Sequence, residues 1–98
     1  MLSSDQNESN SIYLLGYFNY HGIGTSIDKQ KAFELYQKAA NLENNIAQYN
    51  VAYLYRKGEG VGKDKDQAIY WYEKSAEQGN KNAENELKKL RKKRFSFF

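Results

Sequence analysis

The amino-acid sequence predicts an all-α protein, namely an α-α superhelix (solenoid) of two full helix-turn-helix repeats followed by a C-terminal capping helix. Three observations lead to this fold class. The 98-residue chain matches itself at an offset of 36 residues, apolar side chains recur at helical spacing, and capping residues and glycines separate the segments. Repeat periods of roughly 20–50 residues are typical of solenoids and other arrays.

The internal repeat contains no gap, and about a third of its 36 positions are identical. The identical pairs include Tyr13 and Tyr49, Tyr17 and Tyr53, Gly22 and Gly58, Gly24 and Gly60, Asp28 and Asp64, Ala32 and Ala68, Tyr36 and Tyr72, and Ala40 and Ala76. We assign residues 11–46 to repeat one, residues 47–82 to repeat two and residues 83–94 to a half-repeat that forms the capping helix. We expect residues 1–10 to be a flexible N-terminus and residues 95–98 to be a tail.

Five helices are expected, near residues 9–21, 28–42, 45–57, 64–78 and 81–93. The helix near 64–78 shows the pattern most clearly, because its small and apolar residues follow the i, i+3, i+4, i+7, i+8 spacing of one helix face. These residues are Ala68, Trp71, Tyr72, Ser75 and Ala76, and repeat one has Ala32, Leu35, Tyr36, Ala39 and Ala40 in their place. We therefore expect Trp71 to lie in the core.

The expected helix ends carry suitable residues. Asp28 and Asp64 are predicted N-caps, because their carboxylates accept hydrogen bonds from free backbone N–H groups of the first turn. Gln67 has the spacing from Asp64 that a capping box requires. Gly79 is expected to adopt the left-handed conformation after its helix, whereas repeat one has Glu43 at this position.

Repeat two carries a family resemblance. Residues 47–61, Asp64, Ala68, the pairs 71–72 and 75–76, and the turn 79–80 closely resemble the Sel-one-like repeat, a relative of the tetratricopeptide repeat. The resemblance covers residues 11–94, although repeat one departs from the family pattern at Thr25, Leu35 and Glu43. It implies an α-solenoid that holds partner proteins, and it implies no chemistry.

The third unit continues the first-helix pattern with Ala83, Leu87 and Leu90. Lys88, however, occupies the position of Gly16 and Ala52, where a small residue lets the following helix approach. Solenoids need a polar final cap, so we interpret this unit as the capping helix.

The net charge of +3 is concentrated near the C-terminus, because residues 88–94 contain six basic side chains and no acidic one. A nucleic-acid-binding body would spread positive charge over a folded face, so we expect no nucleic-acid partner. We interpret the basic segment with the tail 95–98 as a solvated helix end; a membrane-surface anchor and a nuclear localisation signal are the alternatives. The sequence lacks cysteine and begins without a signal-peptide pattern, which favours a cytoplasmic location, with the nucleus as the alternative.

Catalysis finds no support in the sequence. The glycine-rich segment 58–63 lacks the spacing of a phosphate-binding loop. His21 is the only histidine and has no motif partner for a triad or a metal site. We therefore predict that the protein is not an enzyme and has no catalytic residue, cofactor or metal.

The expected function is that of a protein-protein interaction scaffold that binds a peptide or helix of a partner, acidic or phosphorylated, on its concave face. By analogy with tetratricopeptide repeats, the first helix of each unit lines that face. The predicted binding residues are Tyr13, Tyr17, Tyr20, His21, Tyr49, Tyr53, Arg56, Lys57 and Lys89. Two alternatives stay open: these tyrosines simply pack on neighbouring helices, or the chain is a structural module that stacks into homo-oligomers or onto a larger helical-repeat protein through Leu14 and Phe18.

Overall fold

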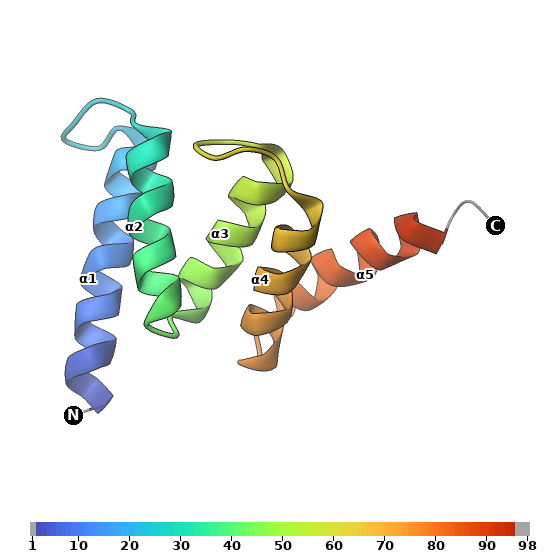
Figure 1. Ribbon diagram of the computed structural model, residues 1–98. Coiled ribbons are helices and arrows are strands. Elements are labelled where there is room, and N and C mark those ends of the chain that lie inside the picture. Colours follow the sequence, from blue (N-terminus) through green and yellow to red (C-terminus); the bar gives the residue numbers. More distant parts are fainter. Residues whose placement is uncertain (1, 96–98) are drawn as a thin grey trace.

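The computed structural model describes residues 2–95, and the side chains of residues 6–92. This part of the chain forms five α-helices and no strand, which confirms the predicted all-α fold. The helices are α1 (Leu2–His21), α2 (Lys29–Asn41), α3 (Asn45–Lys57), α4 (Lys65–Glu77) and α5 (Lys81–Phe95). They follow one another across the molecule in chain order, and α5 points away from α4 at the far end of the stack (Figure 1).

Each helix packs mainly on its neighbours in the sequence. The α1–α2 and α3–α4 loops lie at one end of the helices, and the α2–α3 and α4–α5 loops lie at the other (Figure 1). The result is an elongated stack with extents of 47 × 33 × 16 Å. Contacts between sequence neighbours are what an α-solenoid predicts, because each unit buries its apolar face against the next.

The helix caps follow the sequence rules. The Oδ1 atoms of Asp28 and Asp64 accept hydrogen bonds from the third residue of α2 and α4, at 2.9 and 3.0 Å. Asn44 and Asn80 cap α3 and α5 in the same way, each at 2.9 Å. The capping box expected for Asp64 does not form, because its backbone N–H donates instead to the carbonyl oxygen of Tyr55.

The start of the first helix was placed wrongly from the sequence, whereas the last helix ends within two residues of its predicted boundary. Helix α1 begins at Leu2 instead of near residue 9, and α5 extends to Phe95. The polar residues at the start of α1 show no apolar helical pattern, but they make a tertiary contact. Asn44 Nδ2 donates to Ser9 Oγ at 3.2 Å and to Asn10 Oδ1 at 2.8 Å. Of the predicted flexible N-terminus and tail, residues 1 and 96–98 lie outside the described part.

The core runs along the middle of the stack. It is formed by Ala32, Tyr36, Ala39, Ala40, Ala47, Val51, Ala52, Leu54, Ala68, Trp71, Tyr72, Ala83, Leu87 and Leu90. Trp71 is only 9% exposed, which confirms its predicted place in the core. Gly16 permits a close helix contact, because a Cβ atom there would lie 2.9 Å from the ring of Tyr36. None of the helices in the described range combines the length and the apolar character needed to cross a membrane.

Candidate functional site

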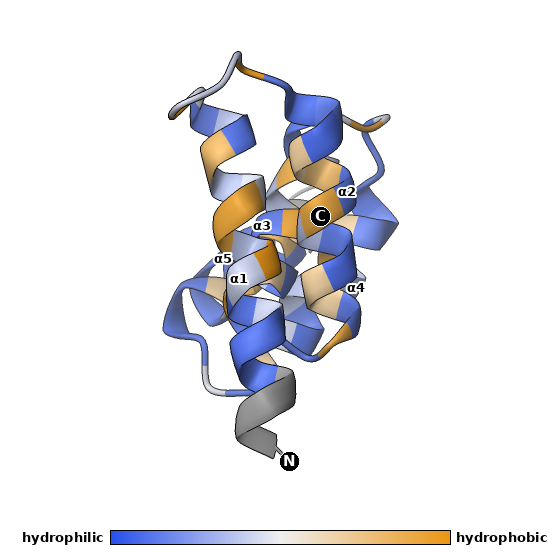
Figure 2. Ribbon diagram, turned by 90° about the vertical axis from the view of Figure 1, so that its left-hand side faces the viewer, coloured by the Kyte–Doolittle hydropathy of each residue, from blue (hydrophilic) through white to orange (hydrophobic). Residues whose placement is uncertain are grey.

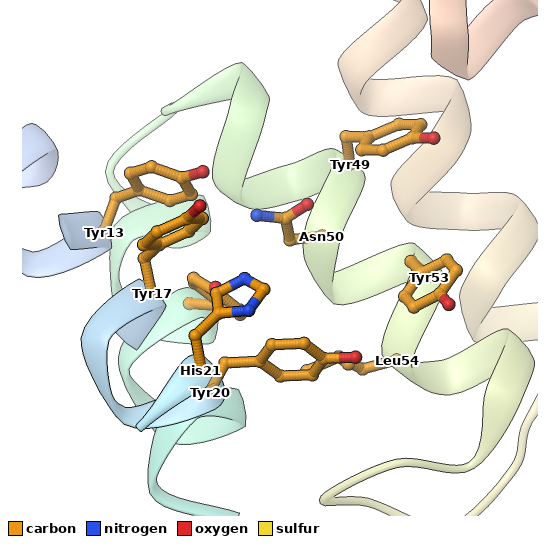
Figure 3. Close-up of a pocket in the computed structure, with 9 residues that line it drawn as sticks. Tyr13, Tyr17, Tyr20, His21, Tyr49, Asn50, Tyr53 and Leu54 are labelled. Atoms are coloured by element: carbon orange, nitrogen blue, oxygen red, sulfur yellow. The ribbon is translucent and has the colours of Figure 1, made fainter. Parts of the chain in front are cut away.

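A pocket of about 250 Å³ lies between α1 and α3, and we call it the tyrosine pocket (Figure 3). Its lining residues are Tyr13, Tyr17, Tyr20, His21, Tyr36, Tyr49, Asn50, Tyr53 and Leu54. The first four come from α1, Tyr36 comes from α2, and the last four come from α3. The pocket therefore joins side chains from repeats one and two.

The rings reach the pocket because helical spacing places them on one side of α1. Tyr13, Tyr17 and His21 are each four residues apart, so they form one ridge along the helix. The ring centroids of Tyr13 and Tyr17 lie 6.3 Å apart, and those of Tyr17 and His21 lie 4.3 Å apart. The ring of Tyr36 stacks on Tyr13 at 5.5 Å. These mutual contacts restrict the orientations of the rings.

The pocket has little charge of its own. Its lining includes no Asp, Glu, Lys or Arg side chain within the described range. The Tyr20 hydroxyl donates a 2.6 Å hydrogen bond to Oε1 of Glu59, and this bond raises the pKa of Tyr20 to about 12. Burial raises the pKa of Tyr36 and of Tyr49 as well. Tyr20, Tyr36 and Tyr49 are consequently neutral at physiological pH, and the pocket offers mainly aromatic surface.

Six of the nine predicted binding residues line this pocket, whereas the three basic ones do not. The Nε atom of Arg56 lies 3.8 Å from Oε1 of Glu86, and its guanidinium group lies over the ring of Tyr53 at 5.5 Å. Lys89 pairs with Glu86 at 3.5 Å, and Lys57 is exposed at the end of α3. Arg56 instead lines a separate hollow with Lys63, Lys65 and Leu90.

Three lining residues were missed from the sequence. Tyr36 and Leu54 follow the apolar pattern of the core, and both are buried, so they form the floor of the pocket. The side chain of Asn50 points into the space between α1 and α3 (Figure 3). The internal repeat did not reveal Asn50, because repeat one has Leu14 at the same position. Asn50 directly follows the predicted binding residue Tyr49 in the sequence, and this proximity was the one indication that it could line the same pocket.

The arrangement is suited to binding. The rings nearest to His21 belong to Tyr17 and Tyr20, with centroids 4.3 and 4.8 Å from the imidazole. Among the residues that the structure describes, no group of three His, Asp or Glu side chains is placed to hold a metal ion.

Comparison with known proteins decides the family. The family model for the Sel1 repeat matches the chain twice, at residues 9–44 and 45–80. The chain belongs to the Sel1 repeat family. Sel1 repeats are generally protein-protein interaction modules, and the proteins that carry them are typically non-enzymatic scaffolds. The match confirms the resemblance seen in the sequence, and both repeats, including the divergent first one, are recognised.

Solved structures of Sel1 repeat proteins resemble this one. A Sel1 repeat protein from Oxalobacter formigenes is 37% identical with a TM-score of 0.82, over 83% of this chain and 61% of that chain. Cysteine rich protein B of Helicobacter pylori is 31% identical with a TM-score of 0.75, over 84% of this chain and 63% of that chain. A protective antigen of uropathogenic Escherichia coli displaying an SLR fold is 40% identical with a TM-score of 0.82, over 95% of this chain and 20% of that chain.

The Sel1 repeat chain described here spans less than two thirds of each of these three proteins. Their likeness therefore concerns the repeats that they share with it. A search of the curated proteins finds no match.

Proposed function

We propose that this Sel1 repeat protein binds a segment of a partner protein, a peptide or a helix, in the tyrosine pocket on its concave face. The observation that carries the proposal is the convergence of six tyrosine rings and His21 on one opening between successive repeats. Tyrosine is enriched at the energetic centres of protein interfaces, because it combines a rigid apolar ring with a polar tip. Binding in the pocket engages both repeats at once.

The dimensions and polarity of the pocket define the segment. A volume of about 250 Å³ has room for one large side chain and not for a whole helix. The ring faces favour an aromatic, aliphatic or cationic side chain. The amide of Asn50, which points into the same space (Figure 3), is placed to hydrogen-bond the backbone beside that side chain. We therefore propose an anchor residue within an exposed peptide or at one face of a helix.

The expected preference for acidic or phosphorylated partners depends on side chains at the rim. Arg56 is already paired with Glu86, so the exposed Lys57 is the basic side chain available at this end of α3. A rim charge acts mainly on the association rate and on its salt dependence. Most of the binding affinity is thus expected to come from the tyrosine pocket. We also propose a cytoplasmic location for the protein.

The experiment is to select peptides on the purified protein from a random peptide display library and to titrate one selected peptide against variants. Tyr17→Ala and Tyr53→Ala each remove one wall of the pocket. Tyr70→Ala is the matched control, because Tyr70 is an exposed tyrosine of α4 outside the pocket. We expect Tyr17→Ala and Tyr53→Ala to weaken binding about 30-fold each, corresponding to a loss of ~2 kcal/mol, and Tyr70→Ala to bind like the parent.

Each variant must first show a cooperative melt, because a partly buried tyrosine also contributes to stability. The proposal fails if folded Tyr17→Ala and Tyr53→Ala bind the peptide as well as the parent does while Tyr70→Ala loses affinity. The binding site would then lie on the convex surface.

A further inference from the structure

The side of α1 that faces away from α2 is apolar and exposed. We call it the α1 outer face, and it consists of Leu14, Leu15 and Phe18 with Ile23 of the following loop. These residues are 48%, 50%, 39% and 49% exposed. Their spacing along α1 places the first three on one side of the helix. Figure 2 looks onto this side of the molecule and shows hydrophobic segments along α1.

Two of these four repeat positions, those of Leu15 and Phe18, are buried in the later units. Leu15 corresponds to Val51 and Leu87, which are 0% and 5% exposed, and the position of Phe18 is 1% exposed in α3 and 8% in α5. Helices α3 and α5 each pack on the helix before them, whereas no helix of the described residues packs on the outer side of α1. Leu15 and Phe18 are therefore exposed on α1 at positions that are buried between helices in the later units.

The face differs from an interface between two successive units. The side-chain amide of Gln48 donates to the carbonyl oxygen of Ala40, and Glu59 pairs with Lys29 at 3.7 Å and accepts the hydrogen bond of Tyr20. These polar contacts connect repeat one to repeat two. At the positions of Gln48 and Glu59, repeat one has Ile12 and Ile23. The outer side of α1 is therefore more apolar than the interface between repeats one and two.

We propose that the α1 outer face binds a second copy of this chain, α1 against α1, in a dimer with two-fold symmetry. Such an interface uses the same surface on both subunits, so an apolar face without directional polar anchors complements itself. The distribution of charge favours dimerisation through α1 over dimerisation through α5. Residues 6–20 contain a single Asp, Glu, Lys or Arg side chain, that of Glu8, so two α1 helices approach without repulsion.

The opposite end of the stack is unsuited to pairing. Residues 81–92 of α5 contain five basic and two acidic side chains, so two α5 helices repel each other. The exposed Lys88 also replaces the small residue that permits close helix contact. Because α1 and α5 lie at opposite ends of the stack (Figure 1), pairing through α1 keeps the two basic segments apart.

The test is the mass of the full chain in solution, measured by sedimentation equilibrium from low micromolar to near-millimolar concentration. We expect a monomer-dimer equilibrium without larger species, and a dissociation constant that does not rise with salt, because apolar contacts are not screened. Leu15→Glu and Phe18→Glu should each raise the dissociation constant about 100-fold or more, since every dimer loses two contacts. Tyr70→Glu, at an exposed tyrosine on α4, should dimerise like the parent.

The two α1 variants replace half-exposed side chains, so we expect their melting temperatures to stay near that of the parent; circular dichroism provides this check. A parent that remains monomeric at all concentrations overturns the proposal. Dimerisation of Phe18→Glu with the affinity of the parent also overturns it. Open-ended assemblies that dissociate in salt would indicate α1 docking on α5 of the next copy and would overturn it too. These outcomes leave peptide binding in the tyrosine pocket unaffected, so the two proposals fail separately.

Discussion

In repeat two, Val51 and Leu54 are buried between α2 and α4, whereas Leu15 and Phe18, at the same positions of repeat one, are 50% and 39% exposed. The glycine turns of the two repeats also differ in how closely other residues approach them. Gly24 and Gly60 have nearly equal φ angles of +71° and +73°, yet a Cβ atom on Gly60 would lie 2.2 Å from the carbonyl oxygen of Lys29, and one on Gly24 would meet nothing within 4 Å.

The comparison separates two effects of the repeated sequence. Matching residues give matching backbone conformations, because caps and turns depend on local interactions. Burial depends on the neighbour in the stack, and among the described residues repeat two is the unit with a helix on both sides. We therefore expect substitutions at matching positions to have unequal effects, with the greater loss of stability in repeat two.

The largest difference in the loss of unfolding free energy is expected between Trp71→Ala and Leu35→Ala. Trp71 and Leu35 occupy the same position in the two repeats. Trp71 is buried against the core, whereas Leu35 is only partly buried. Trp71→Ala should lower the free energy of unfolding by about 3–5 kcal/mol, the usual cost of truncating a buried aromatic residue, and Leu35→Ala should lower it by less. Urea denaturation of both variants measures the two values. Equal losses would mean that the two positions are packed alike.

The next difference concerns the glycine turns. Gly60→Ala and Gly24→Ala both place a side chain in the left-handed region, at about 1–2 kcal/mol each. Gly60→Ala additionally pushes the α3–α4 loop away from the first turn of α2, so we expect a total loss of about 2–4 kcal/mol. Thermal melts of the matched pair provide the measurement. If Gly24→Ala were the more damaging variant, a contact outside the described residues would have to cover that loop.

The smallest expected effect is a gain in stability at Glu43. This residue has a φ angle of +67°, at the position where repeat two has Gly79 with a φ angle of +93°. Glu43→Gly should stabilise the protein by about 1 kcal/mol, because a side chain in the left-handed region is strained. Gly79→Glu is the reverse change, and it should destabilise the protein by about 1–2 kcal/mol. A melting temperature of Glu43→Gly at or below that of the parent would contradict this account.

The number and order of the helices, most of their ends, their N-caps and the buried Trp71 could all be predicted from the sequence. Each of these features depends on residues within a few positions of one another, or on comparison with the other repeat. The aromatic part of the candidate site was predictable for the same reason, since the spacing of Tyr13 and Tyr17 repeats in Tyr49 and Tyr53. The sequence by itself thus determined the fold, the family and most of the side chains around the pocket.

Only the tertiary structure decided how those side chains are used. Tyr20 meets Glu59 across 39 positions of the sequence, Arg56 is paired with Glu86, and Ser9 meets Asn44, which accompanies the early start of α1. These contacts depend on the rise and rotation from one unit to the next. That geometry is the sum of many packing contacts along the stack, and no local pattern of residues encodes it. The sequence already suggested Leu14 and Phe18 as a stacking surface, but only the packed structure showed how much of each side chain is exposed.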